Sequence, residues 1–81
     1  MKSTSKKEKI KMIKNAIEYA LCQYDTDNVD IVKSETNNTV DIMYHSKHNS
    51  FPIVSNVCTS NGLSESDIDK IAEHYDIGCC W

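Results

Sequence analysis

The chain has 81 residues, of which 40 % are hydrophobic and 26 % are charged. A chain of this length buries only about 60 % of its unfolded surface, so it forms one domain with one core and no enclosed substrate cavity of ordinary size. All nine basic residues are lysines. Because arginine supplies the bidentate contacts with phosphate and guanine, its absence argues against a nucleic-acid-binding domain.

Charge is unevenly distributed along the chain. Residues 1–14 carry six lysines and one glutamate, a net charge of +5, whereas residues 15–81 carry three lysines and eleven acids, a net charge of −8. We therefore expect a basic N-terminal arm, flexible over residues 1–7, on an acidic body that favours basic protein partners. The sequence shows neither a secretory signal nor a membrane-spanning stretch, so we expect a cytoplasmic protein whose four cysteines are reduced thiols.

The segment from about Lys7 to Tyr24 is predicted to be an amphipathic helix. Its apolar residues recur every three or four positions, which is typical of a helix that buries one stripe. Beside that stripe, Met12, Ala16 and Tyr19 form an apolar flank. The flank is either the edge of the core or a contact with a second copy or another partner, for which methionine and tyrosine are suited.

Three β-strands are predicted after this helix. Residues 29–34 and 39–45 alternate apolar and polar side chains around an asparagine turn, which is typical of a hairpin. Residues 51–58 form the third strand, and Pro52 either places that strand at an edge of the sheet or moves its start to Ile53. The alternation also places Asp30 and Asp41 on the sheet face opposite the buried one.

The second helix has local signals at both ends. Ser64 is a natural N-cap, and Asp67 three residues later completes a variant of the capping box. Gly78 is predicted to end the helix in the left-handed conformation, which leaves residues 79–81 as a short tail.

Together these elements predict an α+β single domain of order α-β-β-β-α, with a three-stranded antiparallel sheet and both helices on one face. The double-stranded RNA-binding domain shares this element order. That family, however, needs lysines at the start of its second helix, where this chain has Ser64-Glu65-Ser66-Asp67, whose acids would repel phosphates. We therefore expect no direct contact with nucleic acid.

The second helix carries four acids at positions i, i+4, i+8 and i+11, which places them on one strip of about 80°. The strip is either a solvated polar face or a row of negative charge that imitates a phosphate backbone and binds a basic protein. Its members are Glu65, Asp69, Glu73 and Asp76, and Asp30 and Asp41 on the sheet are expected to extend the same field.

Metal binding and catalysis are not favoured by the sequence. The cysteines and histidines lack the paired spacing of structural zinc sites, and the alternative to free thiols is a site built from His74, Cys79, Cys80 and a fourth ligand. No nucleophile motif or phosphate-binding glycine loop is present. We therefore expect no cofactor, no metal and no enzymatic activity.

The small size, acidic body and element order resemble those of some phage-encoded anti-CRISPR proteins. The resemblance covers the architecture of most of the chain and involves no specific motif. It implies a non-enzymatic inhibitor that binds a CRISPR effector nuclease in the host cytoplasm through the acidic strip. The alternative is a small structural or regulatory subunit, a homodimer or an adaptor, that binds through the apolar flank of the first helix.

Overall fold

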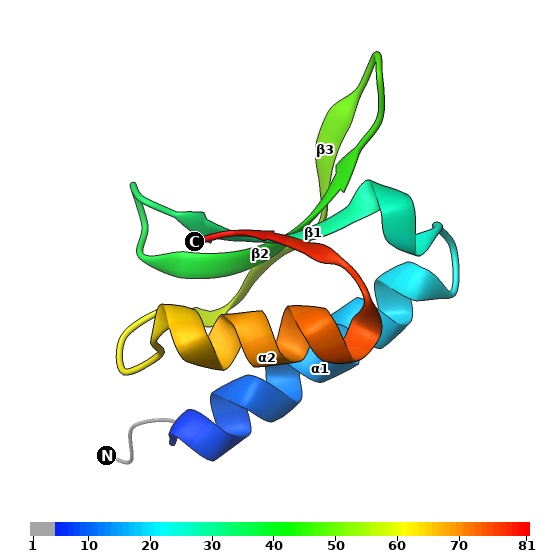
Figure 1. Cartoon of the computed structure of the whole chain (residues 1–81). Coiled ribbons are helices and arrows are strands. Elements are labelled where there is room, and N and C mark those ends of the chain that lie inside the picture. The colour runs from blue at the N-terminus through cyan, green and yellow to red at the C-terminus, as the bar shows by residue number, and fades with distance from the viewer. Residues whose placement is uncertain (1–4) are drawn as a thin grey trace.

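A computed structural model describes residues 5–81 as two helices packed on one face of a β-sheet (Figure 1). The elements in chain order are α1 (Lys6–Leu21), the 3₁₀ helix η1 (Thr26–Asn28), β1 (Val29–Ser34), β2 (Thr39–His45), β3 (Ser50–Thr59), α2 (Glu65–Tyr75) and β4 (Gly78–Cys80). The predicted α+β class is confirmed, and both helices cover the same face of the sheet.

The sheet differs in detail from the prediction, because it has four strands and is not wholly antiparallel. The strand order is β3-β2-β1-β4, and β4 is parallel to β1, with Ile31 opposite Cys79. Residues 79 and 80 therefore belong to a strand rather than to a tail. A strand of three residues is too short for period-two alternation to reveal, and its partner lies far away in the sequence.

The end of α2 also differs from the prediction. Asp76, not Gly78, takes the left-handed conformation, with φ 56° and ψ 45°. Aspartate tolerates this region better than most residues with side chains. Gly78 is needed for a different reason, since a Cβ atom there would lie 2.5 Å from Oδ1 of Asp30. The glycine thus lets β4 approach β1 beside the Asp30 carboxylate.

Helix α1 begins at Lys6, where the side chain of the N-cap Ser5 accepts a hydrogen bond from the Glu8 amide at 3.2 Å. The helix ends at Leu21, so it starts and stops earlier than the sequence predicts. Of the predicted basic arm, residues 1–4 lie outside the described residues, and Lys6 and Lys7 are helical. Lys9 is buried, and its Nζ donates to the Asn61 carbonyl at 2.6 Å.

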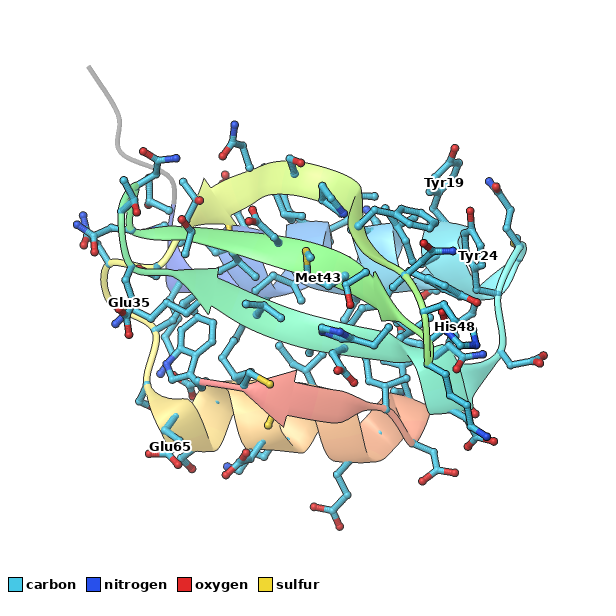
Figure 2. The ribbon with its side chains drawn as sticks, turned by 90° about the horizontal axis from the view of Figure 1, so that it is seen from above. Tyr19, Tyr24, Glu35, Met43, His48 and Glu65 are labelled. Carbon is cyan, nitrogen blue, oxygen red and sulfur yellow. The ribbon has the colours of Figure 1, made fainter. Side chains whose placement is uncertain are left out.

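The core lies between the helices and the sheet. Its fully buried large side chains are Ile13, Ile17, Val29, Ile31, Val40, Ile42 and Ile68. Helix α1 packs mainly against β3, and α2 packs against β4 and β1. No helix of residues 5–81 covers the opposite face of the sheet, and Met43 lies near the centre of that face (Figure 2).

The contact between β4 and β1 gives a first prediction. Gly78→Ala is expected to lower the free energy of unfolding by about 1 kcal/mol, because the added methyl group displaces the Asp30 carboxylate. That carboxylate lies 3.3 Å from Nε2 of His45, so its displacement also breaks the contact between these two side chains.

Urea unfolding of the single and double variants measures this effect. In an Asp30→Ala background the clash is absent, and Gly78→Ala should be neutral or slightly stabilising, as expected for removing a glycine from a strand. Equal destabilisation in the two backgrounds would contradict the assigned role of Gly78.

Candidate protein-binding surface

The predicted acidic strip is present on α2. Glu65, Asp69 and Glu73 follow one another at four-residue intervals and are all exposed. Asp76 is also exposed, but its left-handed conformation places it just beyond the helix, at the end of the row. Figure 2 shows Glu65 at the start of α2, on the side of the molecule that β4 borders. None of these four carboxylates forms a salt bridge with a side chain of residues 5–81.

Asp69 connects the acidic strip to β4. Its Oδ1 accepts a hydrogen bond from Sγ of Cys79 at 3.1 Å, which links the middle of α2 to the edge strand. This hydrogen bond, together with burial and the negative charge of Asp69, raises the pKa of the Cys79 thiol to about 11. A protonated thiol is a weak donor, so the negative charge of Asp69 is not neutralised by this contact.

Asp67 lies on the other side of α2, toward α1, and its charge is compensated. Its Oδ2 accepts hydrogen bonds from the amide and the hydroxyl of Ser64, each at 3.0 Å, and pairs with Nζ of Lys6 at 3.0 Å. The hydrogen bond from the Ser64 backbone and the contact with Lys6 lower the pKa of Asp67 to about 2. Helix α2 therefore has one acidic side that is compensated by Lys6 and one acidic side that has no cationic partner within residues 5–81.

The two sheet residues that were expected to extend the strip lie elsewhere. Asp30 and Asp41 are on the open face of the sheet, whereas α2 covers the opposite face. Asp30 pairs with His45, and Oδ1 of Asp41 accepts the Asn56 amide at 2.9 Å. Asn56 has φ 53° and lies where the β2–β3 register shifts, so Asp41 stabilises an irregularity in β3. The structure does not bring these two acids together with the α2 row.

A series of polar side-chain contacts that the sequence did not reveal lies on the open face of the sheet. Asp30 pairs with Nε2 of His45 at 3.3 Å, and Nδ1 of His45 lies 2.9 Å from Oγ of Ser50. These residue types also form the triads of serine hydrolases, which in addition need an oxyanion hole and a substrate pocket. Here the three groups lie on an open sheet face, and 42 % of the His45 side chain is exposed. We assign these polar contacts a structural role, because they link β1, β2 and β3.

The side of the helical layer between α1 and α2 is basic. A groove of about 290 Å³ has Ile10 and Ile71 as its apolar residues and Lys14, Lys70, His74 and the compensated Asp67 as its polar ones. Opposite charges therefore lie on the two sides of α2. The predicted flank of α1 lies on a third side, where Met12 and Tyr19 are exposed and Ala16 is buried.

The structure describes no group of three or more His, Cys, Asp or Glu side chains placed to hold a metal ion in residues 5–81. Over the same residues, neither helix combines the length and the apolar character that crossing a membrane requires. No protein-family model, curated protein or solved structure matches the chain. The surface chemistry described above is therefore the basis for assigning a function.

The compensated side of α2 gives a prediction for acid unfolding. The pKa of Asp67 is lowered in the folded protein, so its contacts stabilise the fold above pH about 4 and are lost as the pH falls through about 2. Asp67→Asn should be less stable than the wild-type protein at neutral pH, and the gap should close over this window. Urea titrations between pH 2 and pH 5 measure it, with the exposed Asp25→Asn as the control. A gap that stays constant with pH would contradict the assignment.

The contact between Asp69 and Cys79 gives a prediction for thiol reactivity. Removing the carboxylate in Asp69→Asn should bring the thiol pKa back toward its ordinary value of 9.0. Because the thiolate is the reacting species, alkylation of Cys79 by iodoacetamide at pH 9 should be roughly tenfold faster. Mass spectrometry in a Cys80→Ser background isolates this thiol, and Cys22 serves as the internal control. An unchanged rate would show that Asp69 does not hold the thiol.

Proposed function

We propose that the protein is a non-enzymatic inhibitor that binds a basic, nucleic-acid-handling protein through Glu65, Asp69, Glu73 and Asp76. The observation that carries the proposal is that these four exposed carboxylates form one row with no cationic partner in residues 5–81. Each like-charged neighbour on a helix costs on the order of 0.2–0.5 kcal/mol. A basic partner relieves that repulsion.

The spacing of the row supports mimicry of a phosphate backbone. Residues four apart on a helix are separated by about 6 Å along its axis, so Glu65, Asp69 and Glu73 form a regularly spaced line of charge. Grooves that bind nucleic acid are lined with lysine and arginine side chains that meet successive phosphates. A rigid helix with carboxylates on one side offers several negatively charged contacts to such a groove.

The proposed contact is confined to α2. Asp30 and Asp41 already have partners on the opposite face of the sheet, so a flat contact with the α2 row does not reach them. Among basic nucleic-acid-handling proteins, the architectural resemblance to anti-CRISPR proteins makes a CRISPR effector nuclease the first partner to test. Binding there would exclude DNA by direct competition.

A second candidate function is a structural or regulatory subunit that binds through the flank of α1. The exposure of Met12 and Tyr19 favours it. Salt separates the two functions, because the Debye length falls from about 10 Å at 0.1 M to about 3 Å at 1 M. Binding through the acidic row should weaken steeply over this range, whereas binding through apolar side chains should hardly change.

Charge reversal on α2 tests the proposed function. The triple variant Glu65→Lys, Asp69→Lys and Glu73→Lys should reduce affinity for the basic partner at least 100-fold, as expected for lost and reversed charge contacts. Binding to a panel of effector nucleases is measured with labelled protein, with duplex DNA as the competitor.

The control variant carries the same three changes at exposed acids outside the row, at Asp25, Asp27 and Glu35. Each acid-to-lysine change raises the net charge by two, so both variants move from a net charge of −3 to +3. The control should lose much less affinity than the α2 variant. If the two variants lose affinity equally, net charge rather than the row on α2 is responsible, and the proposed contact is wrong.

A further inference from the structure

The chain contains one asparagine that is followed directly by glycine, Asn61-Gly62. The pair lies in the turn between β3 and α2 (Figure 1), and both residues are exposed. The Leu63 amide donates to the Ser60 carbonyl at 3.1 Å, so residues 60–63 form a β-turn with Gly62 at its third position. Gly62 has φ 82°, as a type II turn requires there. The turn therefore places a residue without a Cβ atom directly after an exposed asparagine.

An asparagine side chain can react with the main-chain amide of the next residue. The deprotonated nitrogen of Gly62 attacks Cγ of Asn61, a C–N bond forms, and the side-chain nitrogen leaves as ammonia with the proton of the amide. The resulting five-membered succinimide takes up one water molecule, which opens the ring at either carbonyl and yields aspartate or isoaspartate. No oxidant or reductant is needed. Glycine favours the first step because no side chain shields its nitrogen.

Two features of the turn leave the nucleophile unobstructed. The Gly62 amide donates to no backbone carbonyl within residues 5–81, so it breaks no such hydrogen bond when it loses its proton. A Cβ atom built on Gly62 would have no heavy atom within 4 Å, so the space around this residue is open. Asn49 is also exposed, but it is followed by Ser50, whose side chain partly shields its own amide.

The main-chain carbonyl of Asn61 is contacted by a buried cation. Lys9 of α1 is 8 % exposed, and its Nζ donates to the Asn61 oxygen at 2.6 Å. When the Gly62 amide loses its proton, the negative charge is shared with this same oxygen, because both atoms belong to one peptide group. An ammonium group at hydrogen-bond distance from the oxygen stabilises that charge. Lys9 therefore activates the attacking nitrogen.

The same contact favours one of the two products. In the succinimide, the oxygen beside Lys9 belongs to the former main-chain carbonyl of Asn61. Donation from Nζ polarises this carbonyl, so water attacks it in preference to the side-chain carbonyl. Opening the ring there gives isoaspartate, and the former main-chain carbonyl becomes a carboxylate. A charge-assisted pair with Lys9 then replaces the hydrogen bond to a neutral acceptor.

We propose that Asn61-Gly62 is a self-modification site, at which Lys9 promotes the loss of ammonia from Asn61 and directs ring opening to isoaspartate. The proposal is independent of the function proposed for α2. Either product adds one negative charge, so the net charge changes from −3 to −4. Isoaspartate also lengthens the main chain by one carbon atom, just before the N-cap Ser64 of α2. Older copies of the protein thus differ in charge and turn geometry from newly made ones.

Peptide mapping by mass spectrometry tests the site in the whole 81-residue chain, sampled over days under mildly alkaline conditions. In the wild-type protein, Asn61 should be converted faster than the internal control Asn49. Lys9→Met keeps an apolar stem in the buried position but removes the charge, and it should slow the conversion of Asn61 about tenfold. Lys9→Arg, which keeps a cationic donor, should slow the conversion less. Circular dichroism checks that each variant is folded.

A purely structural role for Lys9 predicts the opposite result, because loss of the contact would loosen the turn and speed ring closure. An unchanged or faster conversion of Asn61 in folded Lys9→Met would therefore overturn the role of Lys9. Conversion of Asn61 no faster than that of Asn49 in the wild-type protein would overturn the site itself.

The product ratio gives a second test that needs no variant, which matters if Lys9→Met does not fold. The wild-type chain should yield a larger share of isoaspartate at position 61 than a synthetic peptide of residues 57–66, which lacks Lys9. An equal or smaller share in the folded chain would contradict the proposal.

Discussion

The structure depends on one constraint, which is that two helices must bury their apolar stripes on the same face of one small sheet. A chain of 81 residues cannot form a second core. Once Ile13 and Ile17 of α1 and Ile68 of α2 are buried, the rotation of each helix about its axis is fixed. Every other side chain on the helices is then assigned to a definite side. The acidic row faces outward beside β4, the basic groove lies between the helices, and the apolar flank lies beside β3.

The elements that the sequence predicts well are those with local signals. The start of α2 is one example, because Ser64 and Asp67 form the expected capping box within four residues of chain. The elements that it misses depend on distant partners. Strand β4 pairs with β1, with Gly78 beside the Asp30 carboxylate, and no pattern within three residues indicates that pairing. Gly78 was predicted to end α2 in the left-handed conformation, but Asp76 takes that conformation and Gly78 belongs to β4.

In the candidate site, too, some features have local sequence signals and others depend on residues far away in the sequence. Helical spacing alone identifies Glu65, Asp69 and Glu73 as a row. Whether a carboxylate is free or engaged depends on residues that lie far away in the sequence, such as His45 for Asp30 and Asn56 for Asp41. Asp67 and Asp69 are two positions apart on one helix, yet within residues 5–81 only Asp67 has a lysine partner, which comes from α1. Sequence therefore locates acidic residues, and tertiary contacts decide which of them are available to a partner.

The most direct test of the account is whether the outer charge of α2 is uncompensated in the free protein. Glu73 and Asp76 are the critical pair, because both lie near the C-terminal end of the helix, where the helix dipole also disfavours negative charge. The double variant Glu73→Gln and Asp76→Asn should gain about 0.5–1 kcal/mol in the free energy of unfolding at low ionic strength, and in 1 M salt the gain should shrink to the part that asparagine contributes in the left-handed conformation of residue 76. A loss of stability at low salt would show that these carboxylates have stabilising partners within the chain, and would contradict the assignment of this surface to a basic partner.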